Sequence, residues 1–258
     1  TATNSTGSTV ATNAGISFTT SATTGTYYYV SPSGVDAVGR GSAGSPFKTL
    51  AYAAKQVPAG QNNTIYLNAG TYTETEGTLL PLGVNIEGAG ESNVTVTASG
   101  NLPTPGVDQS SSDFKLWHDG SLIQLVSPIY SGSNPRYGSP QEMIAAQDGN
   151  QSISGFTLDG NNSTVKAGLW VLNRNNVTVH HVNFRNFKQT GAVFTRGDMW
   201  WYEPLPEGKW MKNLKVYNCT FTNSGSDDGQ QEGCLIIGGI AGAEIYNINI
   251  TDDNGEGI

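Results

Sequence analysis

Six carboxylates stand close together near the end of the sequence, and they are its strongest chemical signal. They fall within thirty residues and comprise Asp227, Asp228, Glu232, Asp252, Asp253 and Glu256. Several carboxylate oxygens in neighbouring loops suit a hard cation such as Ca²⁺. A pair of carboxylates about 5 Å apart or more suits the acid and base steps of glycoside hydrolysis. The third interpretation is that these are solvated loop acids that keep a β-rich protein soluble. All three remain open at this stage.

Cationic side chains near the same region extend the catalytic interpretation. A polysaccharide lyase needs a base near the α-proton of a uronate and a positive charge to neutralise the uronate carboxylate. Arg196 ends a predicted outer strand and is the best single candidate, and Lys209 follows in the next loop. The structural alternative for Arg196 is an ion pair with Asp198. His180 and His181 are predicted to be structural.

Aromatic residues gather in the longest insertion of the C-terminal half. The candidates for contact with a substrate are Trp170, Trp200, Trp201, Tyr202, Lys209 and Trp210. Aromatic rings suit the apolar faces of sugar rings, while neighbouring polar groups bind the hydroxyls. The alternative is that these rings anchor the loop on the wall of the domain.

The elements that must position these residues come from an internal repeat. Residues 152–159, 178–185, 215–222 and 244–251 align with one another, and each is followed by a glycine-led hydrophobic run. Repeats of this kind stack as coils of a solenoid. The alignment predicts that one column of side chains fills the core, namely Ile153, Val179, Val216 and Ile245.

The alternation of apolar residues changes phase inside each repeat. The change falls at Asn218 and Asn247, which predicts a sharp corner with a special backbone angle there. Three short strands per coil, stacked about 4.8 Å apart, make a parallel β-helix. In the expected register Cys234 lies beside Ala192 and points inward while Leu235 points outward. Cys219 and Cys234 are expected to be two packed thiols, with a bridge between them left open.

The N-terminal half divides into an arm and the start of the domain. Residues 1–26 are almost entirely Thr, Ser, Gly, Asn and Ala, which predicts a flexible arm. Residues 27–258 form the predicted β-helix domain. A helix is expected over 45–55, with Ser45 as its N-cap and Pro46 at its first position.

Composition excludes several classes. The chain has 258 residues, a net charge of −8 and only 13% charged residues, which argues against a helical bundle and against a nucleic-acid partner. No apolar run approaches the roughly 20 residues that span a bilayer. The sequence stops just inside a predicted strand, which suggests that a further C-terminal segment completes the solenoid.

Four N-terminal stretches carry a resemblance to a known family. Residues 28–36, 45–50, 64–72 and 84–90 resemble the N-terminal region of right-handed β-helix proteins of the pectate-lyase-like superfamily. The resemblance implies that the 45–55 helix caps the solenoid and that the site lies outside the sheet of glycine-led strands. It also implies that an acid directly before such a glycine, here Glu232 or Glu256, binds Ca²⁺. The sequence departs from that pattern in having Glu in place of Asp.

These observations predict an all-β fold, a right-handed single-stranded parallel β-helix with a short N-terminal capping helix. They favour a secreted polysaccharide-degrading enzyme, leaning to a lyase acting on a uronate-containing glycan. A glycoside hydrolase that uses paired carboxylates is one alternative, and a non-catalytic carbohydrate-binding or adhesive β-helix is another. The catalytic candidates are Arg196, Glu232 and Glu256. The only expected cofactor is Ca²⁺, held by the six carboxylates; no organic cofactor, nucleic acid or membrane span is expected.

Overall fold

A computed structural model describes the domain and part of the arm. It covers residues 25–100, 102, 121–127, 145–161, 165, 167–196, 208–225 and 233–251, and the backbone of three short strands nearer the N-terminus. Among these residues no helix has the length and hydrophobicity that crossing a bilayer requires.

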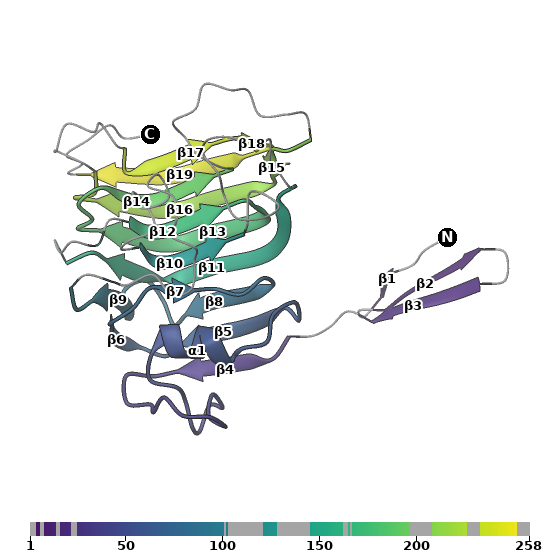
Figure 1. The fold of residues 1–258 in the computed structure, drawn as a ribbon, viewed down its shortest axis with the longest axis horizontal. Helices are drawn as coiled ribbons and strands as arrows, with labels where there is room; N and C mark the ends of the chain where they lie inside the picture. Colours follow the sequence, from purple (N-terminus) through teal and green to yellow (C-terminus); the bar gives the residue numbers. More distant parts are fainter. Residues whose placement is uncertain are drawn as a thin grey trace, which may run out of the picture.

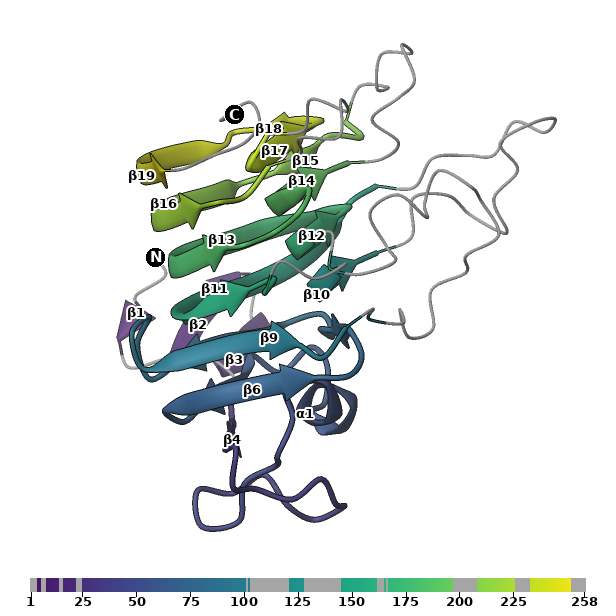
Figure 2. The ribbon, with the colours of Figure 1, turned by 90° about the vertical axis from the view of Figure 1, so that its left-hand side faces the viewer.

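The described residues from 27 onward form a parallel β-helix, which confirms the predicted fold class (Figures 1 and 2). One sheet follows the order β19-β16-β13-β11-β8-β5-β4, with β6 and β9 attached beside β11, and a second follows the order β17-β14-β12-β10-β7. The strands of the first sheet are β4 (Tyr27–Val30), β5 (Asn63–Leu67), β6 (Gly70–Glu74), β8 (Val84–Gly88), β9 (Val94–Ala98), β11 (Gln147–Asp159), β13 (Arg174–Arg185), β16 (Leu214–Thr222) and β19 (Glu244–Thr251). Those of the second are β7 (Thr78–Leu79), β10 (Ser121–Val126), β12 (Ala167–Leu172), β14 (Thr190–Thr195) and β17 (Leu235–Gly238). A short parallel pair joins β15 (Met211–Lys212) to β18 (Ile240–Ala241).

The predicted core column is present. Ile153 pairs with Val179, Val179 with Val216, and Val216 with Ile245, on successive coils. The first three of these side chains are fully buried, and Ile245 on the last described coil is half-buried. Ile86 extends the same column toward the N-terminus. The repeat therefore predicted the stacking register of this sheet correctly.

The corner within each long strand lies where the apolar pattern changes phase. Gly155, His181, Asn218 and Asn247 occupy it with φ values of 80°, 51°, 51° and 53°, in the left-handed region. The Asn247 amide donates to the side-chain oxygen of Asn218 over 3.0 Å, so the corner side chains of these coils bond to one another. The predicted asparagine corner is confirmed, and one of the two histidines does occupy it.

A second corner lies near the start of these strands, inside β11 and β13 and just before β16, and is built in the same way. Asn150, Asn176 and Asn213 adopt φ values of 48°, 57° and 57°. Asn176 donates to Asn150 and Asn213 donates to Asn176, each over 2.8 Å. Asparagine suits both corners because it tolerates the left-handed conformation and its amide bonds along the stack.

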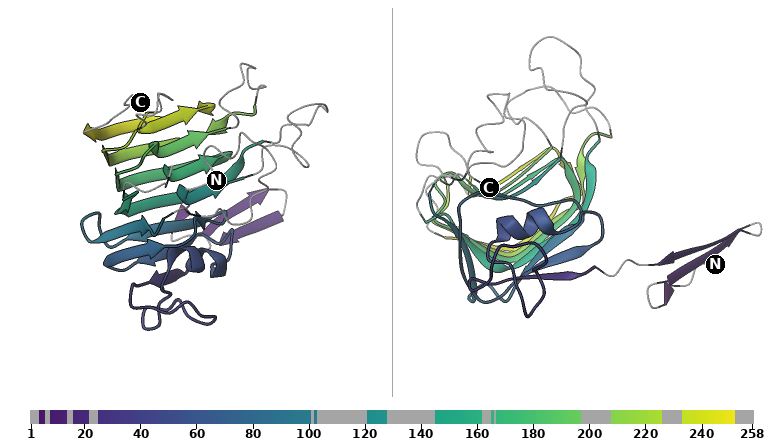
Figure 3. Two further views of the ribbon diagram at one scale, coloured as in Figure 1. Left: turned by 60° about the vertical axis from the view of Figure 1, so that its left-hand side comes forward. Right: turned by 60° about the horizontal axis from the view of Figure 1, so that its bottom comes forward.

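Helix α1 (Leu50–Gln56) lies across the N-terminal opening of the coils (Figure 3). It buries Leu50, Ala51, Ala53 and Ala54, which confirms its predicted capping role. The N-cap is Thr49, whose hydroxyl accepts from the amide of Tyr52, so the prediction of a helix starting at Ser45 is wrong. The reason is that residues 42–47 make bridges in place of a first turn, Ser45 with Ser42 and Phe47 with Val30.

Arg174 is buried at the junction between the two sheets. It is 4% exposed and donates to Ser127 Oγ, to the Leu80 and Val126 carbonyls and to Gln151 Oε1, over 2.8–3.1 Å. Burial lowers the pKa of the guanidinium to about 10, so it remains charged at neutral pH. This one side chain thus links strand ends from three successive coils.

The predicted arm contains strands. The backbone of β1 (Asn4–Ser5), β2 (Ser8–Asn13) and β3 (Ile16–Ser21) forms a small antiparallel sheet beside the solenoid (Figure 1). Flexibility of residues 1–26 stays a prediction.

Candidate functional site

A line of outward-facing side chains runs along the first sheet, one residue for each coil. Backbone pairing places them in a single column, which we call the tyrosine strip: Tyr29, Tyr66, Glu87, Ser154, His180, Tyr217 and Tyr246. The rings of His180 and Tyr217 stack with centroids 5.0 Å apart, and Tyr217 and Tyr246 stack at the same distance. Tyr29 and Tyr66 contact each other at 5.6 Å with tilted planes.

The stacking decides what the strip presents to solvent. Parallel rings that face one another along the solenoid axis expose their edges and hydroxyls, and the tilted rings at the other end expose part of their faces. Tyr246 is 46% exposed and Tyr27, beside the strip, is 48% exposed. The strip therefore presents tyrosine rings and phenol hydroxyls at its two ends, with Glu87, Ser154 and His180 between them.

A hollow of about 520 Å³ interrupts the strip at its centre. Its lining comes from strip residues, the adjoining corner and the 88–93 connection, and consists of Glu87, Gly88, Gly90, Glu91, Ser92, Ser154, Gly155, His180, His181 and Asn183. The floor depends on two glycines, because a Cβ on Gly155 would lie 2.5 Å from the Gly88 carbonyl oxygen. The wall is formed by the residues that separate β8 from β9. In later coils a single long strand continues through the corner at this position.

Five polar side chains form a chain of hydrogen bonds that includes the two histidines of the hollow. From Asn247 the bonds pass to Asn218, to His181 Nε2 over 3.3 Å, from His181 Nδ1 to His180 Nδ1 over 2.9 Å, and from His180 Nε2 to Ser152 Oγ over 3.4 Å. The Asn218 amide can only donate to His181 Nε2, which assigns the proton of His181 to Nδ1 and that of His180 to Nε2. Both imidazoles are neutral in this arrangement. Burial and the neighbouring imidazole lower the pKa of His180, against an opposing effect of Glu87.

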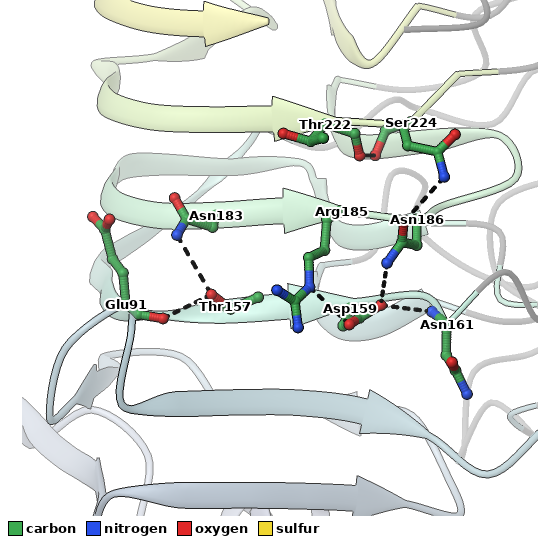
Figure 4. A network of polar contacts seen from close by, with 10 residues as sticks. Glu91, Thr157, Asp159, Asn161, Asn183, Arg185, Asn186, Thr222 and Ser224 are labelled. Atoms are coloured by element: carbon green, nitrogen blue, oxygen red, sulfur yellow. Dashed lines mark hydrogen bonds and ion pairs between the residues drawn. The ribbon is translucent and has the colours of Figure 1, made fainter. Parts of the chain in front are cut away.

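Two carboxylates face the hollow. Glu87 accepts a hydrogen bond from the Tyr27 hydroxyl over 3.1 Å, and this bond raises the pKa of Tyr27. The Glu91 carbonyl accepts from Thr157 Oγ1 over 2.8 Å, which fixes the wall beside Asn183 (Figure 4). Within the described ranges no lysine or arginine forms an ion pair with either carboxylate.

A polar network continues from this wall along the face beyond the corner (Figure 4). Asp159 forms an ion pair with Arg185 Nε over 2.7 Å and accepts from the Asn186 amide and the Asn161 backbone N–H. Burial favours the protonated acid, but these hydrogen bonds and Arg185 outweigh it and lower the pKa of Asp159. Asp159 and Arg185 therefore pair with each other, and Arg185 remains 48% exposed.

Most of the predicted site residues lie outside the described residues. These are the six carboxylates Asp227, Asp228, Glu232, Asp252, Asp253 and Glu256, and the aromatic residues Trp200, Trp201 and Tyr202. Among the residues that the structure describes, no three His, Cys, Asp or Glu side chains are grouped to hold a metal ion. The calcium site and the glutamate pair stay predictions.

The described members of the predicted site do not form an open groove. Trp170 points outward as expected but is 2% exposed, packed with Leu172 and Val193, so its prediction as an exposed sugar platform is wrong. Arg196 is fully buried, and its guanidinium donates to the Lys209 carbonyl. Arg196 is thus not exposed as the predicted groove requires, and its catalytic role stays a prediction. Of the predicted set, Trp210 is 40% exposed.

The register of the last described strand of the second sheet also differs from expectation. Ala192 pairs with Leu235, so Leu235 points inward and Ile236 outward. The extra residue is accommodated at Cys234, whose carbonyl accepts from both Gly191 and Ala192. Cys219 and Cys234 are buried free thiols, as expected.

The tyrosine strip was missed in the sequence, although a signal for it was present. His180, Tyr217 and Tyr246 hold the same position in the aligned repeats 178–185, 215–222 and 244–251. The aromatic residues at this position therefore mark an outward column in the sequence, in parallel with the inward column of core residues.

Comparison with solved structures finds distant similarity. The ORF18 protein of Geobacillus virus E2 is 14% identical with a TM-score of 0.45, over 95% of this chain and 47% of that one. A rhamnogalacturonan lyase is 14% identical with a TM-score of 0.42, over 89% of this chain and 56% of that one. The pectin methylesterase from carrot is 14% identical with a TM-score of 0.42, over 90% of this chain and 65% of that one. The chain thus spans about half the length of the first two proteins.

No curated protein matches the sequence. A family model described as "Protein of unknown function (DUF1565)" matches residues 33–258, which is nearly the whole solenoid. The chain belongs to the DUF1565 family, and the described residues between 33 and 258 fold as a parallel β-helix.

Proposed function

We propose that this protein is an extracellular carbohydrate-binding β-helix that holds a linear polysaccharide along the tyrosine strip. The observation that carries the proposal is the regular column of outward side chains from Tyr29 to Tyr246, one for each coil. Six intervals of about 4.8 Å give the strip a length of about 29 Å, which suits a polymer better than a small molecule.

The chemistry of the strip matches that of a sugar polymer. Tyrosine offers an apolar ring and a hydroxyl with little conformational entropy to lose, because only two side-chain torsions must be fixed. A polysaccharide likewise alternates C–H and O–H groups along its length. The central hollow adds acceptors at Glu87 and Glu91 and hydroxyls at Ser92 and Ser154. Carbohydrate recognition requires apolar ring surface together with hydrogen-bonding groups at its edge, and a tyrosine side chain supplies both.

Substitution along the strip tests this proposal. Affinity electrophoresis in gels that contain soluble polysaccharides should show retardation of the wild-type protein. Tyr217→Phe removes only the hydroxyl and should weaken binding by about five-fold, and Tyr217→Ala, which removes the ring as well, by about thirty-fold, at about 1 kcal/mol for each contribution. Thr73→Ala, on an exposed position beyond the corner, is the matched control and should bind as wild type. Retardation that is absent with every glycan, or unchanged in both Tyr217 variants, would refute the proposal.

A second candidate is that the protein also cleaves the bound glycan. It is favoured by Glu87, Glu91, His180 and His181 around one hollow, since carboxylates and imidazoles are the usual general acids and bases. β-Elimination on a uronate would produce an unsaturated product with new ultraviolet absorbance, and hydrolysis would produce new reducing ends without it. Cleavage that disappears in Glu87→Gln supports catalysis in the hollow. Cleavage that survives Glu87→Gln but is lost with EDTA would instead support the predicted calcium site.

A further inference from the structure

The hollow at the centre of the tyrosine strip carries a net negative charge, and this charge limits which sugar can occupy it. Its titratable side chains are Glu87, Glu91, His180 and His181. The Tyr217 ring stacks on His180. The charge of the hollow therefore depends on whether the two imidazoles balance the two carboxylates.

The hydrogen-bond chain keeps both imidazoles neutral. His181 Nε2 accepts from Asn218, and Nδ1 of one histidine must donate to Nδ1 of the other at 2.9 Å. A proton added to His180 would place two N–H groups against each other across that distance, so the contact would be lost. The lowered pKa of His180 agrees with this geometry.

The described lining of the hollow contains no lysine or arginine, and two basic side chains of β13 and β16 form ion pairs elsewhere. Arg185 bonds Asp159 over 2.7 Å, and Lys215 bonds Glu244 over 3.1 Å. Glu87 has the Tyr27 hydroxyl as its partner, which stabilises a carboxylate without neutralising it. Two carboxylates thus face the hollow with no compensating cation among the described residues.

We propose that the hollow binds the ammonium group of an amino sugar, so that the polysaccharide held by the strip contains glucosamine-type residues with free amines. This proposal rests on the proposed function, because the strip must hold the rest of the polymer. A polyuronate is the least suitable ligand, since its carboxylates would meet Glu87 and Glu91 and a protein surface of the same sign. The preference for a uronate glycan favoured by the acidic cluster in the sequence is thereby reversed for this site.

Three hexasaccharides of matched length provide the test. The full chain is titrated by calorimetry with the hexamer of β-1,4-linked glucosamine, with its fully N-acetylated form and with hexagalacturonate, at neutral pH and moderate salt. We expect the free amine to bind about ten-fold more tightly than the N-acetylated form, and hexagalacturonate to bind most weakly. Each single substitution, Glu87→Gln or Glu91→Gln, should weaken glucosamine binding by roughly three- to five-fold and should lower the preference for the glucosamine hexamer over the N-acetylated hexamer.

Controls separate this site from general attraction to an acidic protein. Glu76→Gln removes the same charge at a carboxylate that pairs with Lys55, away from the hollow, and should leave binding unchanged. Hexalysine is the second control, and equal binding of hexalysine would overturn the amino-sugar proposal in favour of a basic peptide. Thermal melts of the glutamine variants confirm that each is folded.

The possible failures are distinguishable. If the N-acetylated hexamer binds as tightly as the amine, or if both glutamine variants keep the wild-type preference, the amino-sugar proposal is overturned while carbohydrate binding stands. If no hexasaccharide and no neutral polysaccharide binds, the proposed function itself fails.

Discussion

Replacement of Arg174 by methionine should destabilise the protein strongly. The guanidinium is buried and donates four hydrogen bonds, to Ser127, Leu80, Val126 and Gln151. Methionine has a similar length, so it fills most of the volume but donates nothing. The change therefore isolates the polar role of Arg174 from its packing role.

The magnitude follows from the acceptors left behind. The Ser127 hydroxyl can rotate to another partner, but the carbonyls of Leu80 and Val126 cannot move. The side-chain oxygen of Gln151 is also fixed, because its amide nitrogen already donates to the carbonyls of Pro81 and Val84. Three buried acceptors without donors, at about 1–1.7 kcal/mol each, give an expected loss of about 3–5 kcal/mol.

Equilibrium urea unfolding followed by far-ultraviolet circular dichroism measures this loss. With an m-value of about 3 kcal/mol/M, the midpoint should fall by about 1–1.7 M. Arg40→Met, at an exposed arginine, is the matched control and should shift the free energy of unfolding by less than about 0.5 kcal/mol. A difference below about 1 kcal/mol between the two variants would show that strand ends are not held by this side chain.

Four further predictions concern individual groups. Gly155→Ala should cost about 2 kcal/mol more than Gly39→Ala in thermal melts, because both positions have positive φ but only at Gly155 would the new Cβ lie 2.5 Å from a backbone oxygen. The lowered pKa of His180 means that the unfolded chain binds its proton more readily, so stability should fall as pH drops through the ordinary value of 6.5, and His180→Gln should flatten that slope. Burial outweighs two backbone hydrogen bonds and raises the pKa of Glu74, so stability should fall as pH rises above 4.5 through the raised value, and Glu74→Gln should remove this dependence. Burial raises the pKa of the Cys219 thiol to about 11, so it should react with a thiol reagent at pH 8 only after denaturation.

The inward half of the architecture could be predicted because core residues repeat with fixed spacing. Val179, Val216 and Ile245 hold equal positions in the aligned segments. A shift of the strand register by one residue would turn each of these side chains toward solvent. The corner at Asn218 was predictable for a similar reason, since few residue types accept its backbone angle. The register of the second sheet was harder to predict, because the glycine that leads each strand does not fix where backbone pairing begins. Ala192 pairs with Leu235, one residue later than the predicted partner Cys234.

The site was less predictable because it depends on what lies beyond the coil. Outward-facing Trp170 has the same local pattern whether its ring is covered or exposed, and only the structure shows that it is buried. Arg196 likewise ends an outer strand, yet its side chain turns inward to a carbonyl. The hollow arises from a missing side chain at Gly155 opposite Gly88, two positions distant in sequence that are brought into contact only by stacking.

Because the rise between coils is fixed, the length of the tyrosine strip changes in steps of one coil. Because each coil contacts only its neighbours, a coil duplicated between β13 and β16 would lengthen the strip by about 4.8 Å while leaving the hollow intact. Under the proposed function, the length of polymer bound and the sugar selected would therefore be set by different parts of the solenoid, and the number of coils could change without changing the hollow.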